Sequence, residues 1–430
     1  MTSSDKLATR ILISLGVGIV AGLLIRGLGQ FWPGILPPAR WVATEVLDPL
    51  GQIFLRLLFM VVVPLVFGSL ALGVTQLGRL DRLGPLAGRT FLFFLINMAI
   101  GTALGLLIMN LVRPGEWIDE ATQKAMLTEF GGSAATIVEK KESTAIDLNV
   151  IVDMFLPRNF LQAVVNFQVL PLIIFALLVG AAGTTLSAER RARLIEGLEL
   201  LNELMTRLVH LALLLAPFAV PAMIASVIIK FGFGFLQSLS IFLAAALLTI
   251  ALHLFGTMSL LLKMFTRRSP RLFFRAIRTV IVTAFSTSSS NATLPTTIQV
   301  SRERLGISAS TAGFVLPLGA TMNMSGTALY EGCVVLFIAQ VYGVPVSLFH
   351  QLFLLTMAVL SAVAVAGIPG ASLPLIVGLL ATLGIPPEGI ALVLGVDRIL
   401  DMARTTLNVA ADVVTACIVD EQVGQVSPAE

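Results

Sequence analysis

Residues 286–297 read STSSSNATLPTT, a run of hydroxyl and amide side chains within a chain whose mean hydropathy is +0.95. Arginines flank the run, with Arg278 before it and Arg302 after it. The apolar residues 279–285 (TVIVTAF) are too few to cross a bilayer. Because the chain must enter the membrane and return to the same side, we predict a re-entrant helical hairpin whose polar tip is surrounded by protein or water. A polar cytoplasmic loop is the alternative.

The composition places this chain in a membrane. Of its 430 residues, 57% are hydrophobic and 12% are charged, which is far from the balance of a soluble domain. We predict membrane helices in six apolar stretches, because we expect each to be long enough to span about 30 Å of hydrocarbon. These stretches are 11–25, 51–75, 90–112, 149–182, 205–230 and 236–262.

The charged residues of the loops predict the orientation. Arginine and lysine gather in 6–10, 79–89, 190–193 and 263–278, which we assign to the cytoplasm by the positive-inside rule. The acidic segment 114–148 is then external. Both termini are predicted to be cytoplasmic, and the protein is expected to be a multi-pass protein of the cell inner (plasma) membrane. The same loop bias explains the net charge of +3, so no nucleic-acid partner is expected.

Two later apolar segments are interrupted by small and polar residues. They are 317–332 (PLGATMNMSGTALYEG) and 359–380 (VLSAVAVAGIPGASLPLIVGLL). Broken helices free backbone carbonyl and N–H groups, which bind cations and substrates near the middle of the membrane in secondary transporters. We predict a broken helix in the first segment and a second hairpin, entering from outside, in the other. A kinked helix with packing glycines is the alternative for the first.

The last apolar segment, 397–420 (DRILDMARTTLNVAADVVTACIVD), carries a polar stripe. At 100° per residue its polar positions fall within roughly 80° of arc on one helix face. Ionisable side chains inside a membrane are costly unless they face a cavity or one another, so the stripe predicts a functional site. An Asp–Arg ladder that locks two helices together is the alternative. The stripe consists of Asp397, Asp401, Arg404, Asn408 and Asp412.

Three motifs together resemble those of the dicarboxylate/amino acid:cation symporter family, which includes the glutamate transporters. They are SSSNATLP (288–295), the segment 317–332, and DRILDMARTTLNVAAD (397–412), in the order typical of the family. The resemblance covers nearly the whole chain. It implies an all-α integral membrane protein with eight transmembrane helices and two re-entrant hairpins, a homotrimer, and elevator-type movement of a transport core against a fixed scaffold.

The resemblance also implies a division of the chain. Residues 1–89 would hold scaffold helices 1 and 2, and 90–148 would hold transport helix 3 and an external loop. Scaffold helices 4 and 5 would follow in 149–235. The transport core would occupy 236–430, with helix 6, hairpin 1, helix 7, hairpin 2 and helix 8.

Substrate contacts are implied on several of these segments. Arg404 matches the arginine that receives a side-chain carboxylate, and Asp401 matches the aspartate that receives an amino group. Their chemistry agrees, because a guanidinium binds a carboxylate through two parallel bonds while a carboxylate favours a cationic amine. The implied substrate is aspartate or glutamate. The remaining implied contacts are Ser289, Ser290, Thr327, Ile368, Gly370, Ser372, Thr405 and Asn408.

The implied sodium sites match the family unevenly. One is complete, and it offers the oxygen ligands that hard cations prefer. Its residues are Gly319, Asn323, Asn408 and Asp412. A second site would use backbone carbonyls, which survive side-chain changes. Its residues would be Thr321, Ala362, Val363 and Val365.

The third sodium site departs from the family. Ser325 stands where the family pattern N-M-D-G-T has aspartate, and three positions near 94–98 lack the family's hydroxyl groups. Fewer than three coupled sodium ions are therefore expected. The three positions are Phe94, Asn97 and Met98.

Two further features bear on charge. The second arginine that members carry is absent, because Ser288 and Met402 occupy its positions, and Arg398 is an extra candidate that could also pair elsewhere. Glu331 matches the position that animal glutamate transporters use for proton coupling. An exposed glutamate at a helix end is the alternative.

The expected function is secondary active symport of aspartate or glutamate, driven by a sodium or proton gradient, with no resident cofactor. A dicarboxylate or neutral amino acid symporter of the same fold is the alternative, although Asp401 with Arg404 argues against it. A passive anion channel is a second class, and concentrative uptake distinguishes it. A serine hydrolase is not expected, because the three histidines are distant in sequence from 288–290 and the chain has no G-x-S-x-G motif.

Overall fold

The computed structural model describes residues 3–77, 85–118, 158–165, 169–364 and 372–424, and every regular element in these ranges is a helix. The all-α class predicted from the sequence is therefore confirmed. The α-helices are α1 (Ser3–Phe31), α2 (Leu36–Val42), α3 (Asp48–Leu77), α4 (Pro85–Val112), α8 (Phe160–Val165), α9 (Val169–Thr184), α10 (Ala188–Leu213), α11 (Ala216–Phe231), α12 (Phe233–Ala251), α13 (Met258–Phe265), α14 (Pro270–Ala276), α15 (Arg278–Thr287), α16 (Ser290–Glu303), α17 (Ala309–Met322), α18 (Ser325–Val341), α19 (Leu348–Ala364), α20 (Leu373–Thr382) and α21 (Leu394–Gly424). Short 3₁₀ or π turns are η1 (Pro33–Ile35), η2 (Ala43–Leu47), η4 (Pro114–Trp117), η5 (Leu252–Thr257) and η6 (Pro387–Leu392).

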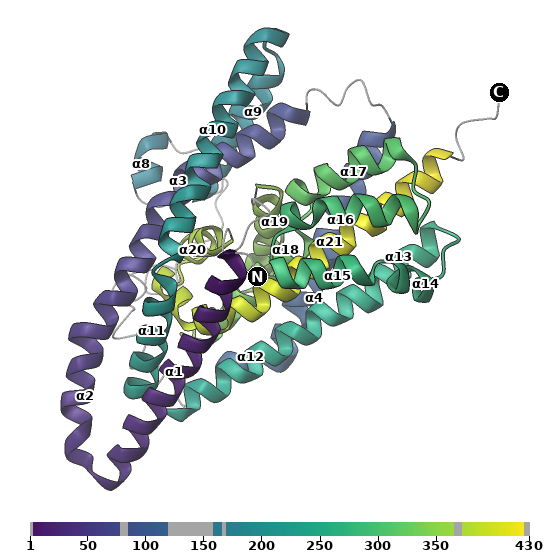
Figure 1. The fold of residues 1–430 in the computed structure, drawn as a ribbon. Coiled ribbons are helices and arrows are strands. Elements are labelled where there is room, and N and C mark those ends of the chain that lie inside the picture. The colour runs from purple at the N-terminus through teal and green to yellow at the C-terminus, as the bar shows by residue number, and fades with distance from the viewer. Residues whose placement is uncertain (1–2, 78–84, 119–157, 166–168, 365–371, 425–430) are drawn as a thin grey trace, which may run out of the picture.

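The helices form two neighbouring groups (Figure 1). In one group α1 packs along α11, and α3 packs along α9 and α10. In the other, α18 packs against α4 and α21, and α21 also contacts α15 and α17. The arms α19 and α20 both contact α3 and so connect the groups.

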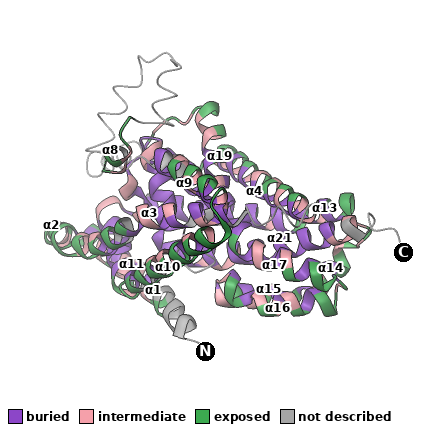
Figure 2. Cartoon of the chain, turned by 90° about the horizontal axis from the view of Figure 1, so that it is seen from above, coloured by how far each residue is buried: buried purple, intermediate pink, exposed green. Residues whose placement is uncertain are grey.

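The outer surface is apolar, as expected for a chain surrounded by lipid. Large apolar side chains such as Val17, Leu24 and Leu248 are exposed, and Figure 2 shows the exposed outer faces of α1 and α10. Five helical stretches in the described part of the chain are long and apolar enough to cross a membrane. They are Ile13–Phe31, Leu86–Trp117, Phe235–Phe265, Ala309–Val341 and Leu394–Gln422. The fold is thus that of a multi-pass membrane protein.

Most of the predicted apolar stretches coincide with helices, but 205–230 does not form a single one. α10 ends at Leu213 and α11 begins at Ala216. Pro217 lies in the first turn of α11 and has no N–H to continue the hydrogen bonding of α10. The prediction of one crossing helix over 205–230 is therefore wrong. The predicted stretch 149–182 is described only from 158 onward, in α8 and α9.

The polar run 286–297 covers the end of α15, the turn at Ser288 and Ser289, and the first part of α16, and the two helices pack together as predicted for a hairpin. Ser288 ends α15 with a left-handed φ of 49°. The Ser289 hydroxyl then caps α16 by accepting a bond of 3.2 Å from the Ala292 N–H. The Thr293 hydroxyl donates to the Ser289 carbonyl at 2.8 Å. Hydroxyl groups therefore satisfy the backbone that the turn exposes, and the run is not an open loop.

The segment 317–332 is broken, as predicted. α17 ends at Met322 and α18 begins at Ser325, with two residues between them outside helical geometry. Asn323 and Met324 have ψ values of 65° and 58°, so the chain unwinds without a left-handed residue. The break gives the free backbone groups on which the sequence interpretation depended.

The second interrupted segment has its two predicted helical arms, α19 and α20. The arms contact each other and pack beside α18. Residues 366–371 of its predicted tip (AGIPGAS, 366–372), with Ile368 and Gly370, lie outside the described residues, whereas Ser372 is described.

Candidate functional site

The polar stripe of α21 lies in the interior of the protein. Figure 2 shows α21 as a largely buried helix at the centre of its group. Every member of the predicted stripe is buried, so none of these charges faces lipid. Buried charges must be paired or bind a charged ligand, because isolated ones are too costly.

Asp401 lies between two arginines of its own helix. Its Oδ1 accepts two bonds from Arg404, at 3.0 Å from Nε and 2.8 Å from Nη2. Its Oδ2 accepts a bond of 3.2 Å from Nη1 of Arg398. The spacing of three residues on either side places both guanidinium groups next to the carboxylate. The sequence left the partner of Arg398 open, and the structure identifies it as Asp401.

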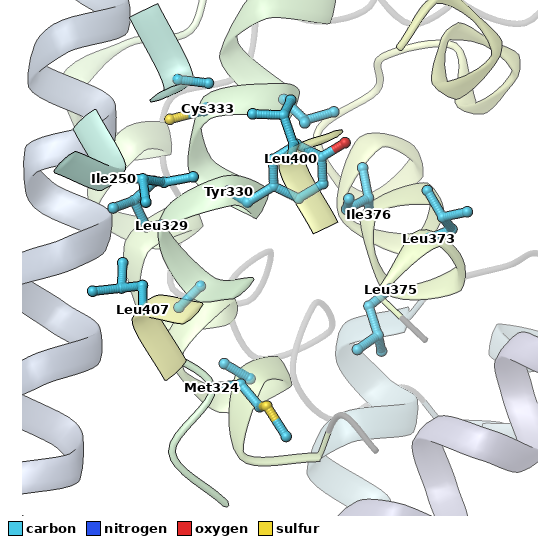
Figure 3. Close-up of a cluster of buried hydrophobic side chains, with 14 of the residues drawn as sticks. Ile250, Met324, Leu329, Tyr330, Cys333, Leu373, Leu375, Ile376, Leu400 and Leu407 are labelled. Carbon is cyan, nitrogen blue, oxygen red and sulfur yellow. The ribbon is translucent and has the colours of Figure 1, made fainter. Parts of the chain in front are cut away.

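Arg404 is also held by α18. Its guanidinium carbon lies 4.6 Å from the centroid of the Tyr330 ring, and its Nη1 lies 3.8 Å from Oδ1 of Asp397. The Tyr330 hydroxyl donates a bond of 2.8 Å to the same Asp397 oxygen. Figure 3 shows the Tyr330 ring within a cluster of buried apolar side chains that includes Leu400 and Ile376, so this part of the site is apolar. Electrostatic interactions are stronger in such surroundings than in water.

The break between α17 and α18 lies beside Asn408 and Asp412 of α21. The Asn323 side chain donates a bond of 2.9 Å to Oδ1 of Asp412, and the Gly326 N–H donates one of 2.7 Å to Oδ1 of Asn408. A Cβ at Gly319 would overlap the Asp412 carboxylate, so glycine allows α17 to approach α21 this closely. The structure thus brings together the four residues predicted for the first sodium site.

The residues predicted for the second sodium site are less fully described. The exposed Thr321 hydroxyl donates to the Leu318 carbonyl at 2.9 Å within α17. Ala362 is buried and Val363 is half-buried near the end of α19, which contacts α17. Val365 lies outside the described residues.

Two residues predicted to contact the substrate, Thr405 and Thr327, form hydrogen bonds with Asp401 and Asn408. The Thr405 hydroxyl donates to the Asp401 carbonyl at 2.7 Å, one helical turn earlier. The Thr327 hydroxyl accepts a bond of 3.4 Å from the Asn408 amide. Both hydroxyls therefore form hydrogen bonds with residues of the stripe.

The hairpin contacts lie on separate segments. Ser289 and Ser290 form the turn that begins α16, and Ser290 is buried. Ser372 is buried just before α20. Ile368 and Gly370 belong to the undescribed tip.

Several buried polar atoms in α21, at the helix break, in α18 and in the two hairpin segments have no hydrogen-bond partner within the described ranges. Buried polar groups nearly always have partners, and an unsatisfied one costs about 1–3 kcal/mol. Donors and acceptors both occur in this set, so a ligand with carboxylate and ammonium groups, or a cation, could satisfy it. The atoms are Ser288 Oγ, Asn323 Oδ1, Glu331 Oε1, Ser372 Oγ, Arg398 Nε and Arg404 Nη1.

Glu331 is fully buried in α18. Its carboxylate accepts a short hydrogen bond from the Ser361 hydroxyl of α19. The alternative of an exposed glutamate at a helix end is therefore wrong, because α18 is covered by neighbouring helices over most of its length.

A second polar cluster was missed by the sequence interpretation. His253, in the π turn η5, has its Nε2 at 3.0 Å from the Ser325 hydroxyl, which also donates to the Asn97 carbonyl at 3.1 Å. The Asn97 side chain donates to the Thr415 hydroxyl at 3.1 Å. All four residues are fully buried. A histidine inside an apolar membrane helix was itself a usable signal, since such residues seldom lack a role.

This second cluster occupies the region where the resemblance implied a third sodium site. Phe94 and Met98, one on each side of Asn97, are buried among apolar side chains. Neither offers an oxygen atom. Hydrogen bonds among His253, Ser325, Asn97 and Thr415 therefore occupy the place where the family pattern has a charged aspartate.

The fold and the site together define a class of protein. Interrupted apolar segments that expose backbone and buried charges beside a helix break are the arrangement of secondary transporters, in which half-helix ends face substrate and ions.

Comparison with known families agrees with this class. The sequence model described as "Sodium:dicarboxylate symporter family" matches residues 7–422, and the chain belongs to this family. It is therefore a transporter and not an enzyme, and the predicted resemblance is confirmed.

Similar proteins extend over nearly the whole chain. A "Proton/sodium-glutamate symport protein" of Bacillus subtilis (strain 168) is 33% identical, covering 99% of this chain and 94% of the relative. A "Proton/glutamate-aspartate symporter" of Escherichia coli (strain K12) is 30% identical, covering 96% and 92%. A "C4-dicarboxylate transport protein" of Solibacter usitatus (strain Ellin6076) is also 30% identical, covering 96% and 91%.

Proposed function

We propose that this chain is a symporter that takes up L-aspartate or L-glutamate together with sodium and a proton. The observation that carries the proposal is the buried pairing of Asp401 with Arg404, in which Nη1 of Arg404 has no hydrogen-bond partner among the described residues. An acidic amino acid offers a carboxylate for the guanidinium and an ammonium for the carboxylate. It is the substrate class whose charges match both partners.

Substrate binding is an exchange of partners. The side-chain carboxylate of the substrate binds the Arg404 guanidinium, which releases Oδ1 of Asp401. The substrate ammonium group then donates to that oxygen. Tyr330 keeps the guanidinium in place through its ring during this exchange. Both charged residues thus remain paired, which avoids the large penalty of a lone buried charge.

The hairpin tips complete the pocket in this proposal. Ser289 and Ser290 of the first tip, and Ile368, Gly370 and Ser372 of the second, contact the amino acid backbone of the substrate. The Ser372 hydroxyl, which has no hydrogen-bond partner among the described residues, supports this assignment. Thr327, Thr405 and Asn408 contribute further polar contacts from α18 and α21.

Sodium binds at the helix break. Asp412 has no ion-pair partner among the described residues, and its described side-chain hydrogen bond comes from Asn323. Asn323 also keeps an oxygen without a hydrogen-bond donor in the described chain. A sodium ion beside the carboxylate neutralises this charge, with further oxygens from Asn408 and the Gly319 carbonyl. The second carbonyl site at Thr321, Ala362, Val363 and Val365 is proposed on the resemblance alone.

Proton coupling is assigned to Glu331. The carboxyl group is fully buried, its hydrogen-bond partner in the described chain is Ser361, and it makes no ion pair there. A buried carboxyl without a cation is far less costly when it carries a proton. Carrying that proton across the membrane would couple transport to pH.

A C4-dicarboxylate or neutral amino acid carrier of the same fold is the alternative. A dicarboxylate would leave the Asp401 carboxylate facing a bare methylene group and would bring a second negative charge beside it. A neutral amino acid would leave Arg404 without a carboxylate. The Asp401–Arg404 pair therefore favours acidic amino acids.

The proposal includes the architecture implied by the resemblance: eight transmembrane helices, two re-entrant hairpins, a homotrimer and elevator movement. Residues 1–89 and 149–235 form the scaffold, while 90–148 and 236–430 form the moving core and external loop. Both termini are cytoplasmic in the inner membrane. The packing supports this division, because α4 packs mainly with α18 and α21, whereas α1 packs mainly with α11 and α3 mainly with α9 and α10.

Competition for binding tests the substrate class. Purified protein in a buffer that contains sodium ions is incubated with radiolabelled L-aspartate. L-Glutamate, succinate and L-asparagine are then added as competitors. We expect L-glutamate or unlabelled L-aspartate to displace the label at much lower concentrations than succinate or asparagine. Stronger displacement by succinate would favour the dicarboxylate alternative.

A further inference from the structure

Arg398 has a place in the binding site that none of the preceding assignments explains. Its side chain is 10% exposed, and its Nη1 donates a bond of 3.2 Å to Oδ2 of Asp401. Arg404 occupies the other oxygen of the same carboxylate. The Nε of Arg398 is buried and makes no hydrogen bond to any described residue. An arginine buried this deeply in a membrane protein is costly, so its presence calls for a functional reason.

The charges of this part of α21 balance. Asp397 and Asp401 contribute two negative charges, and Arg398 and Arg404 contribute two positive charges. All four side chains are buried and joined through the Asp401 carboxylate or the Asp397–Arg404 ion pair. The group is therefore neutral before substrate arrives, although Arg404 alone would leave it with an excess of one negative charge.

We propose that Arg398 is a positioning residue that keeps Asp401 charge-balanced when Arg404 turns to the substrate, and so sets the preference for anionic substrates. This inference rests on the proposed function, in which Arg404 exchanges Asp401 for a substrate carboxylate. Arg398 holds Oδ2 throughout the exchange. Asp401 is then never a buried carboxylate without a cation, and its Oδ1 becomes available to an ammonium group.

The proposal predicts an effect that depends on substrate charge. Without the Arg398 charge, the four-residue group becomes negative by one unit, and it repels each ligand in proportion to the ligand's own negative charge. Asparagine, aspartate and succinate have similar sizes and carry net charges of about 0, −1 and −2 at neutral pH. The loss of affinity should therefore increase along this series.

The experiment measures binding of the three compounds to purified full-length protein in sodium, by calorimetry or by competition. For Arg398→Gln we expect a loss of less than about threefold for asparagine, about tenfold for aspartate and more for succinate. Arg398→Lys keeps the charge and should retain at least about a third of the wild-type aspartate affinity. Equal losses for all three ligands, or no loss, would overturn the proposal, because they indicate a packing role or none.

A matched control contacts the other end of the same helix. Arg268 also approaches an acidic residue of α21, with its Nε at 4.0 Å from Glu421, but at the opposite end from the site. Arg268→Gln should leave the order and the ratios of the three affinities unchanged. If Arg398→Gln does not fold, the double variant Asp397→Asn with Arg398→Gln removes one charge of each sign. Because its group is again neutral, the double variant should bind the three ligands with affinity ratios closer to wild type than those of Asp397→Asn alone. Ratios no closer to wild type than those of Asp397→Asn would overturn the role of the Arg398 charge.

The two proposals can fail separately. If wild-type protein binds succinate more tightly than aspartate, the proposed substrate class is wrong, and the charge-graded loss in Arg398→Gln still tests Arg398. If only one of the three ligands binds, the affinities of Arg398→Lys and Arg398→Gln for that ligand are compared. Equal affinities of those two variants would overturn the role of the Arg398 charge.

Discussion

Arg404 donates two hydrogen bonds to a single oxygen of Asp401, three residues before it on α21, at 3.0 and 2.8 Å. A cationic and an anionic side chain thus form a hydrogen-bonded ion pair inside the protein, and both are buried. Any substrate that separates them must replace both partners. This requirement is the physical basis of the proposed selectivity for a compound with a carboxylate and an ammonium group.

Replacing Arg404 should remove the binding of acidic side chains. Arg404→Cys is expected to lower aspartate and glutamate uptake by at least about 100-fold, because their carboxylate would be buried without a cation. Neutral amino acids such as serine should become substrates. Uptake of labelled compounds into proteoliposomes measures both effects. Unchanged uptake of acidic amino acids would remove the assignment of Arg404.

Replacing Asp401 should weaken the preference for amino acids over dicarboxylates. Asp401→Ser removes the partner of the ammonium group, and a hydrogen bond to a charged group contributes about 1.5–3 kcal/mol. We expect aspartate affinity to fall by about 10–100-fold, while succinate affinity falls less or rises. The ratio of the two affinities is the measurement. A variant that still discriminates strongly for the α-amino group would place that contact elsewhere.

Glu331 should determine the response to a proton gradient. If this carboxyl carries a proton inward with the substrate, an acidic exterior accelerates uptake by the wild-type protein, and Glu331→Gln loses that acceleration. The exposed Glu303 offers a control, because Glu303→Gln should respond like the wild type. Wild-type flux that is independent of external pH would exclude Glu331 as the proton carrier.

Sodium stoichiometry should be lower than three ions per substrate. The third site implied by the family resemblance has Ser325 in place of an aspartate, and its neighbours Phe94 and Met98 offer no oxygen. Buried sodium needs several oxygens and usually a nearby negative charge. Reversal potentials measured across imposed sodium gradients give the number of ions. Three ions per substrate would show that other ligands replace the lost ones.

The main features of the fold could be predicted because they depend on local sequence. The first hairpin has its turn at two serines. Ser288 ends α15, and the Ser289 hydroxyl caps α16 by accepting a hydrogen bond from a backbone N–H. The stripe of α21 follows from helical periodicity, which places Asp401 and Arg404 on one face. The break before Ser325 follows a cluster of small and polar residues.

Contacts between helices could not be predicted in the same way. A helical wheel gives the direction of Arg398 around α21 but does not show that its guanidinium reaches back to Asp401. The burial of Glu331 depends on helices that cover α18, and Ser361 is 30 residues away in sequence. The pairing of His253 with Ser325 joins residues 72 positions apart. Such relationships come from packing, which single-sequence periodicity does not encode.

The most direct test of the account is uptake of labelled L-aspartate into proteoliposomes, with inward sodium and proton gradients imposed separately and together. We predict concentrative uptake that requires sodium, increases with an inward proton gradient, and is blocked by excess glutamate but not by excess asparagine. Sodium-independent equilibration without accumulation, or accumulation of succinate in preference to aspartate, would contradict this prediction.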